Sequence, residues 1–440
     1  MDAEIDAALS EMEALKSRRQ VLRVGGALGA LGVAGAATTL TGCAPTSAPG
    51  NPWAGPTWYW PSDTTIPATS GTGSDPRWVW DPEADDLVGS LLERGDVPDV
   101  NQKLRSWIKN GQALPTGLPP DVVTFIERAR QLPPWTDQSL LDKAARFNTK
   151  RGLYLGVTYG FASGMMSTVI PHEARAVFYS KGGADMQDRI TKTAKLGYDV
   201  GATGGFSPGG EMVVTCVKTR LAHAGVRNLL PTSPTWLDGA TEPGRIPISQ
   251  QDMLVTWHSL PTTVMKQLSK WKVPLDKGET LGFLHSWQLT GHLLGIRDEY
   301  IPRSWAQART QSAAMLDPVL APTPEGIDLA GQLVNLGSMI DGGLITRPVL
   351  RALTRFVLGD RIANWLRLPE EPFWETALEV AWGPFIAVRE GVLGLSGAPP
   401  ILTQVYSTFD EILRVGALWY LSGGQFPISI QIPTANNPEI

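Results

Sequence analysis

The chain is poor in cysteine, and this limits how it can be stabilised. Its 440 residues include two cysteines, Cys43 and Cys216. If Cys43 is removed or acylated with an export signal, Cys216 has no disulfide partner, and we expect it to be a small buried apolar residue. The sequence therefore predicts stability from a large core or a bound cofactor, without a disulfide.

Several ligand and cofactor motifs are missing as well. There are five histidines but no His-x-x-x-His pair, and there is no Cys-x-x-Cys, which excludes zinc sites of familiar spacing. No Gly-x-Gly-x-x-Gly follows a predicted strand, so a dinucleotide-binding fold is not indicated. The formal net charge is −5 without a long basic run, which argues against a nucleic-acid partner.

One apparent hydrolase motif also fails on inspection. Gly205-Phe206-Ser207-Pro208-Gly209 fits the Gly-x-Ser-x-Gly pattern. A nucleophile elbow needs the backbone N–H after the serine for its oxyanion hole, and Pro208 has none. No strand precedes this loop, so we interpret the match as the composition of a Gly-rich loop.

The clearest feature that is present is an export signal. Arg18 and Arg19 precede an apolar stretch at 24–40, rich in Gly and Ala, that ends in a lipobox at Cys43. Paired arginines in this position are typical of the twin-arginine route, which exports folded and often cofactor-loaded proteins. A membrane anchor helix is the alternative, although the glycines make a poor span. Cys43 is either the site of a lipid anchor or lost on simple cleavage.

Composition and periodicity predict a mainly α globular protein. Hydrophobic residues make up 42% of the chain and charged residues 18%. Apolar spacings of three and four predict helices at 85–94, 98–110, 120–131, 140–150, 154–167, 185–198, 211–230, 249–258, 261–271, 278–294, 326–339, 347–366 and 374–395. Few strand patterns and no internal repeat are visible.

His223 lies in a predicted helix with a distinctive set of neighbours. Cys216, Arg220 and Arg227 fall within about 60° of it on one helix face. A haem iron takes a proximal imidazole, and its propionates need cations nearby. A partly buried polar face would give the same pattern.

The preceding helix and its upstream loop add candidates. Arg189, Lys192 and Thr193 share one face, and the Gly-rich loop at 201–210 can fold that helix back against the one with His223. Glu173 follows the helix that ends near residue 167. It is either an exposed carboxylate at a helix start or a buried one with a raised pKa, suited to act as a base.

Three stretches together resemble the latex clearing proteins, which are secreted bacterial rubber oxygenases with a b-type haem. They are Pro171-His172-Glu173, DRITKTAKLGYDV at 188–200 and EMVVTCVKTRLAHAGVR at 211–227. A fourth stretch, GFLHSWQLTGHLLGI at 282–296, resembles the wider oxygenase family. The resemblance covers most of the chain from about residue 75, and the order, the spacing and the export signal agree.

The resemblance implies a role for each matching residue. His223 matches the proximal haem ligand, and Lys192 matches the residue that closes the distal iron position in the resting state. Arg189 and Thr193 match neighbours in that motif, and Glu173 matches the catalytic base. Arg220 and Arg227 match arginines needed for an intact haem site. A further haem-site arginine of the family corresponds to Arg351 or Arg355, and the sequence does not choose between them.

The resemblance also implies a fold, a function and a domain order. We expect a globin-like helical core with one haem b per chain, and a monomeric, secreted or cell-surface dioxygenase. With O₂ it cleaves poly(cis-1,4-isoprene) within the polymer, leaving oligo-isoprenoids with aldehyde and ketone ends. The expected segments are a signal peptide with lipobox (1–42), a Pro/Ser/Trp-rich tether (43–75), an N-terminal helical extension (76–146), a haem-binding catalytic domain (147–400) and a C-terminal extension (401–440).

Two other functions fit the same residues. One is an exported haem-binding electron-transfer lipoprotein, and the other is a related oxygenase acting on a smaller isoprenoid or lipid. The residues leave open the product length, internal against chain-end attack, and the resting coordination of the iron.

Overall fold

The structure is a computed structural model that describes residues 75–239, 247–340, 346–394, 417–418, 420–424 and 426–438. These residues form helices and loops without a named strand, and one isolated bridge joins Ser180 to Asn436. The predicted mainly α class is confirmed. The predicted signal peptide at 1–42, nearly all of the tether and residues 401–416 of the predicted C-terminal extension lie outside the described residues.

Three helices begin the described chain: α3 (Pro82–Arg94), α4 (Val97–Leu104) and α5 (Pro120–Ala129). Each has a proline in its first turn, where the missing N–H has no intrahelical partner to lose. The predicted helix at 98–110 is wrong beyond Leu104. There the side-chain Oε1 of Gln112 accepts from the N–H groups of Ile108 and Lys109, which a longer helix would need for itself.

Two long helices form the centre of the core. α6 (Gln138–Val157) lies against α15 (Lys277–Leu293) and continues through the π-helix Thr158–Gly164 into α7 (Met165–Ser167). Gly282 lets the two backbones approach closely, because a Cβ there would lie 2.5 Å from the carbonyl oxygen of Leu140. Phe147 and Phe283 pack across this contact with ring centroids 4.6 Å apart.

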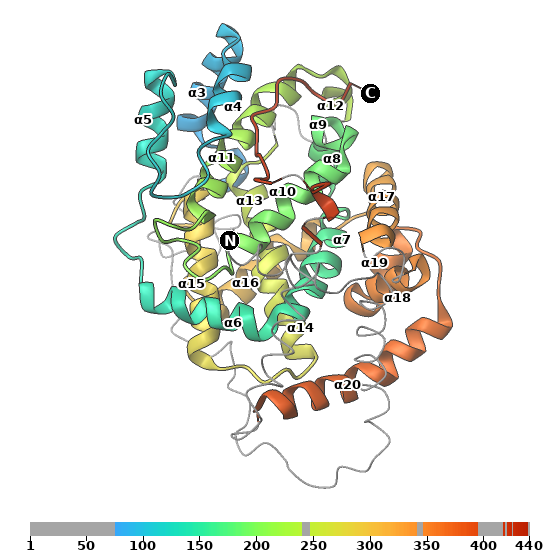
Figure 1. Ribbon diagram of the computed structural model, residues 1–440. Coiled ribbons are helices and arrows are strands. Elements are labelled where there is room, and N and C mark those ends of the chain that lie inside the picture. The colour runs from blue at the N-terminus through green and yellow to red at the C-terminus, as the bar shows by residue number, and fades with distance from the viewer. Residues whose placement is uncertain are drawn as a thin grey trace.

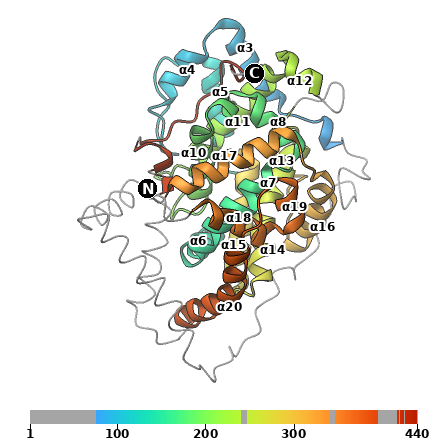
Figure 2. The same ribbon diagram turned by 90° about the vertical axis from the view of Figure 1, so that its right-hand side faces the viewer.

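The other helices lie above, beside and below this pair in Figure 1, and Figure 2 shows the same arrangement from the side. They are α8 (Pro171–Tyr179), α9 (Lys181–Ala184), α10 (Met186–Asp199), α11 (Met212–Leu229), α12 (Pro234–Gly239), α13 (Gln250–Trp257), α14 (Thr263–Lys270), α16 (Trp305–Met315), α17 (Pro324–Ile340), α18 (Arg347–Leu358), α19 (Asp360–Trp365) and α20 (Pro372–Gly394). Short 3₁₀ turns lie at Pro76–Trp78, Leu230–Thr232 and Asp317–Val319.

The periodicity missed four helices and misplaced several junctions. α8, α9, α12 and α16 were not predicted, and α8 is central to the candidate site. The predicted break at 151–153 is wrong, because α6 continues to Val157. The single helix predicted at 347–366 is wrong because Gly359, with φ of 85°, separates α18 from α19. The helices predicted at 249–258 and 261–271 are instead joined by the π-helix His258–Thr262.

The Gly-rich loop folds α10 back against α11, as the sequence predicted. Asn110 donates from Nδ2 to the carbonyl oxygens of Gly205 and Ser207, at 2.8 and 2.6 Å. The Ser207 hydroxyl donates to the carbonyl of Gly204 at 2.7 Å, which fits a structural role. Cys216 is buried and free, as expected, and burial raises the pKa of its thiol.

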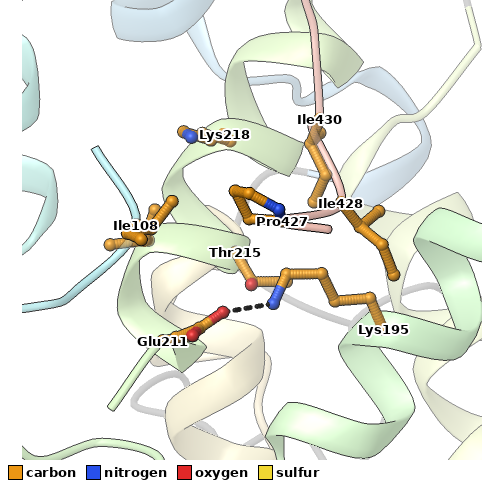
Figure 3. A pocket seen from close by; sticks show the side chains of 9 residues that line it. Ile108, Lys195, Glu211, Thr215, Lys218, Pro427, Ile428 and Ile430 are labelled. Carbon is orange, nitrogen blue, oxygen red and sulfur yellow. Dashed lines mark hydrogen bonds and ion pairs between the residues drawn. The ribbon is translucent and has the colours of Figure 1, made fainter. Parts of the chain in front are cut away.

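A buried ionic cluster fastens α10 to α11 beneath this loop. Lys195 Nζ lies 2.8 Å from Asp199 Oδ2 and 2.7 Å from Glu211 Oε2. Asp199 also accepts from the hydroxyl of Thr215, and Glu211 accepts from Lys109. Figure 3 shows Lys195 and Glu211 facing each other beside Pro427 and Ile428.

The described C-terminal arm lies over the helices that carry the candidate residues. A Cβ at Gly225 of α11 would lie 2.7 Å from Pro433, so the arm packs directly on this helix. Asn436 and Asn437 donate to the carbonyls of Leu229 and Phe178. The arm thus ties α11 to α8 (Figure 1).

In the part of the chain that the structure describes, no single helix is long and apolar enough to cross a membrane. The segments Gln138–Ser167 and Pro171–Tyr179 pass the length and composition test only together, with an 85° bend between them.

Candidate functional site

Glu173 lies in the first turn of α8, where its carboxylate reaches α13. Pro171 begins the helix after the extended residue Ile170, which turns the chain sharply away from α7. Thr256 of α13 donates from its hydroxyl to Glu173 Oε2 at 3.1 Å. Within the described part of the chain, Thr256 is the one side chain that donates a hydrogen bond to the Glu173 carboxylate. A carboxylate can accept about four hydrogen bonds, so most of the acceptor sites of Glu173 have no side-chain donor.

The pKa of Glu173 is raised to about 7, as the sequence suggested. Burial is the largest cause, since it disfavours the charged form. The positive charge of Arg189 and the hydrogen bond from Thr256 act in the opposite direction, while the carboxylate of Asp252 raises the pKa further. A carboxyl with this pKa can take up and release a proton near neutral pH.

Arg189, on α10, faces the same region. Burial lowers the pKa of its guanidinium, and the charge of Glu173 opposes that shift. Its positive charge also lowers the pKa of His223. α8, α10 and α11 therefore bring Glu173, Arg189 and His223 into one electrostatic neighbourhood.

His223 is held neutral inside α11. Its pKa is lowered to about 3, first by burial and then by the charges of Arg227 and Arg189. Its Nδ1 atom is buried and has no hydrogen-bond partner. A neutral imidazole with an unpartnered ring nitrogen is in the form that binds a metal.

The other four histidines are each engaged. His172 contacts Asp252 at 3.0 Å, and His292 contacts Asp298 at 2.6 Å. His258 bonds Thr262 and Gln311, and His285 accepts from the backbone N–H of Asp137. These contacts explain the four residues structurally and leave His223 as the histidine best suited to hold a cofactor.

Arg220 and Arg227 are paired with carboxylates of the α3 segment. Arg220 donates to both oxygens of Asp81, at 2.6 and 2.8 Å. Arg227 donates from Nε to Asp85 at 2.6 Å. These ion pairs fasten α11 to α3, so both arginines position the helix that carries His223.

Lys192 and Thr193 make their hydrogen bonds within α10. Lys192 Nζ lies 2.6 Å from Asp188, one turn earlier, and the Thr193 hydroxyl donates to the carbonyl of Arg189 at 3.1 Å. Of the three α10 residues, Arg189 is thus the one that the electrostatics connect with Glu173 and His223.

Arg351 and Arg355 both belong to α18 and are held by acidic residues. Arg351 donates to Glu371 at 3.1 Å, and Arg355 pairs with Asp360 and Glu375. The contacts therefore do not distinguish which of the two matches the family's further haem-site arginine.

Several residues of this site escaped the sequence reasoning. Thr256 and Asp252 looked like ordinary helical residues, and nothing in their spacing linked them to Glu173. Asp81 and Asp85 could have been predicted as partners of Arg220 and Arg227, because two acidic residues one turn apart complement two arginines on one helix face. No group of three or more His, Cys, Asp or Glu residues in the described ranges could hold a metal ion, so a cofactor here would depend on a single imidazole.

Known proteins match this chain over most of its length. Residues 150–388 match the family described as ER-bound oxygenase mpaB/B'/Rubber oxygenase, catalytic domain. The rubber oxygenase of Streptomyces sp. (strain K30) is 46% identical over 423 residues, covering 96% of this chain and 99% of that protein. The solved structure of latex clearing protein LCP in the closed state has a TM-score of 0.75 and 46% identity, covering 86% of this chain and 100% of that one.

Proposed function

The chain belongs to the family of ER-bound mpaB-type and rubber oxygenases, and we propose that it cleaves poly(cis-1,4-isoprene) with O₂. The similarity to a rubber oxygenase along nearly the full length of both proteins supports this substrate. The products are oligo-isoprenoids with one aldehyde and one ketone end. A hydrocarbon polymer offers no charge or hydrogen bond, so its binding depends on apolar contacts.

The observation that carries the proposal is the half-buried Glu173 on α8, whose carboxylate contacts Thr256 and whose pKa is raised to about 7. The substrate brings no base of its own. In the proposed reaction the carboxylate of Glu173 would accept the proton of the allylic C–H next to the double bond, while the electron pair of that C–H bond passes to the O₂ that oxidises the substrate. Thr256 holds one oxygen of the carboxylate, and Arg189 favours its charged form.

A b-type haem fits the residues around His223. The imidazole is neutral at working pH, one of its ring nitrogens lacks a partner, and the chain has no Cys-x-x-Cys-His for covalent attachment. His223 is the proximal ligand in this proposal, and Arg220 and Arg227 hold its helix in place. The haem supplies the activation of O₂, which no side chain can provide.

Lys192 is the proposed distal ligand of the resting state. Its ammonium now pairs with Asp188 on the same helix. To hold the iron, the side chain of Lys192 would have to leave Asp188. The Thr193 hydroxyl donates to the carbonyl of Arg189, one turn earlier on the same helix.

Export by the twin-arginine route completes the proposal. A polymer too large to enter a cell must be attacked outside it, and a haem loaded in the cytoplasm requires export of a folded protein. We propose a monomer that works outside the cytoplasm, either anchored at the cell surface by a lipid on Cys43 or released after cleavage of the signal.

The decisive experiment follows O₂ uptake and product formation by the purified protein on polyisoprene latex. We expect a red protein, haem that acidified butanone extracts, and products with carbonyl ends. A red protein that consumes no O₂ on latex would favour electron transfer, and a colourless but active protein would contradict the haem assignment.

A further inference from the structure

Three of the four charged residues of helix α20, namely Glu375, Arg389 and Glu390, face the protein. Glu375 pairs with Arg355 at 3.2 Å, and Glu390 accepts from Arg151 and from the hydroxyl of Tyr154. Arg389 is 2% exposed and lies over the Tyr154 ring. Surface helices normally have the opposite arrangement, with charge towards water.

The outward face of α20 is mostly apolar, with Thr376 and Glu379 exposed beside the apolar residues. Phe373, Ala377, Val380, Pro384 and Ala387 follow one another at spacings of three and four, so they form one stripe along the helix. Phe373 is 73% exposed and Val380 69% exposed. Trp374 flanks the stripe and is 39% exposed. Among the described residues of α20, Glu379 is the one charged residue that is exposed.

α20 lies at the edge of the part of the chain that the structure describes. Its inner side packs on α18, where Trp382 contacts Phe356 and Trp271. In both ribbon views α20 runs along the lower edge, at the end opposite α12 (Figures 1 and 2). We call the outward residues Phe373, Trp374, Ala377, Val380, Pro384 and Ala387 the α20 face.

The charge pattern indicates what kind of surface the α20 face fits. Helices that lie on anionic lipid present Lys or Arg to the headgroups, and α20 has no basic residue except the buried Arg389. A large exposed apolar patch marks an interaction site. An uncharged hydrocarbon complements a face that carries aromatic and aliphatic groups with almost no charge.

We propose that the α20 face is a docking surface that adsorbs the protein onto solid cis-1,4-polyisoprene, apart from the residues that carry out cleavage. This rests on the proposed substrate. Adsorption concentrates the enzyme at a polymer that cannot diffuse to it. The α20 face therefore governs the apparent affinity for particles, while Glu173 governs the rate of each cleavage.

The test compares a triple variant, Phe373→Ser with Trp374→Ser and Val380→Ser, against a matched control, Leu237→Ser with Met339→Ser. The control changes two exposed apolar residues on α12 and α17. Binding to polyisoprene latex particles is measured without O₂, so that no cleavage occurs. We expect the triple variant to bind at least about tenfold more weakly, and the control to bind within about twofold of the wild type.

Enzyme kinetics on particles separates a defect in docking from a defect in catalysis. The triple variant should show a higher KM for particles, with unchanged kcat and unchanged turnover of a short, detergent-dispersed cis-isoprenoid. Equal particle binding by both variants would overturn the docking proposal and leave the proposed function intact. A wild type that neither binds nor oxidises polyisoprene would instead contradict the function itself.

Other occupants of the α20 face give different results, and each overturns the proposal. Equally strong, variant-sensitive binding to phosphatidylcholine vesicles would indicate a lipid surface. A wild-type dimer that the triple variant converts to monomer would indicate self-association. A fall in Tm of more than about 5 °C in the triple variant would mean that another part of the chain covers these residues.

Discussion

The charged side chains at the two ends of α10 differ in how many hydrogen bonds they make. Towards its C-terminal end, Lys195 is hydrogen-bonded to both Asp199 and Glu211, and each of those carboxylates has a second donor. Burial lowers the pKa of Lys195, but the two carboxylates raise it by more, so its ammonium stays charged. Burial raises the pKa of Asp199, and Lys195 and Thr215 oppose that shift. Towards the N-terminal end, Arg189 interacts with Glu173 electrostatically, and the hydroxyl of Thr256 donates a hydrogen bond to the Glu173 carboxylate.

The difference teaches how to separate structural from reactive charge in this protein. A buried charge that is fully hydrogen-bonded holds helices together and has little reason to change protonation state. A buried carboxylate with few partners keeps a pKa near neutrality, at a cost in stability, and clusters of this kind mark functional sites. The predictions below test this division.

Replacing the proposed iron ligand should have the largest effect. His223→Ala removes the neutral imidazole, so we expect loss of haem, of all oxygenase activity and of the stability that bound cofactor confers. His292→Ala is the control, because His292 pairs with Asp298 near the surface. The pyridine haemochrome spectrum measures haem content, and full haem in His223→Ala would mean that another residue is proximal.

Removing the proposed base should abolish most turnover without loss of haem. Glu173→Gln leaves a neutral amide that cannot accept the allylic proton, and such losses typically reduce rates by about 10² to 10⁴. Glu379→Gln changes an exposed glutamate and is the matched control. Product yield and haem content are measured on the same preparation, and normal yield with full haem would remove Glu173 from the mechanism.

Breaking the structural cluster should affect stability instead of chemistry. Lys195→Met leaves Asp199 and Glu211 buried without their shared cation, which we expect to cost about 3–5 kcal/mol of unfolding free energy. Turnover per haem-bearing molecule should stay within about threefold of the wild type. Denaturant unfolding checks the predicted loss of stability, and specific activity checks the predicted turnover. A Lys195→Met variant that is stable but inactive would contradict the structural role assigned to the Lys195 cluster.

The pH dependence should follow Glu173. As a base it acts in its charged form, so kcat/KM should rise with pH up to about 7 and then level off. Stability has the opposite dependence. Because the folded pKa lies above the usual 4.5, the contribution of Glu173 to stability is complete below about pH 4.5 and is lost as pH rises through 7.

The raised pKa of Glu173 also predicts how the stability of the Glu173→Gln variant depends on pH. Glu173→Gln cannot ionise, so above pH 7 it should be at least as stable as the wild type, whereas Lys195→Met is less stable. Thermal unfolding at pH 5 and pH 8 checks this, and a large loss of stability in Glu173→Gln at pH 8 would place Glu173 among the structural charges.

Lys192→Ala should have the smallest effect on the fold. The Lys192–Asp188 ion pair is partly exposed, and such pairs contribute about 0–1 kcal/mol. Haem should be retained, while the resting visible spectrum changes if the amine is the distal ligand. An identical spectrum would show that Lys192 does not touch the iron in the resting state.

Local sequence patterns predicted the helices that carry the candidate residues, because helical periodicity and capping act over a few residues. α10 and α11 were predicted to within about a turn, as was the close packing that the Gly-rich loop imposes on them. α8 was missed because it has nine residues and a small apolar stripe. The 347–366 prediction failed at Gly359, where the chain adopts a positive φ that periodicity does not reveal.

The sequence by itself determined the mainly α class and the placement of Arg220, His223 and Arg227 on one helix face. The tertiary structure decided which charges are satisfied. Asp81 and Asp85 come to Arg220 and Arg227 from more than a hundred residues away, and Thr256 comes to Glu173 across 83. Helix propensity is a local property, whereas burial and pairing depend on segments that meet only after folding, and these set the pKa of Glu173.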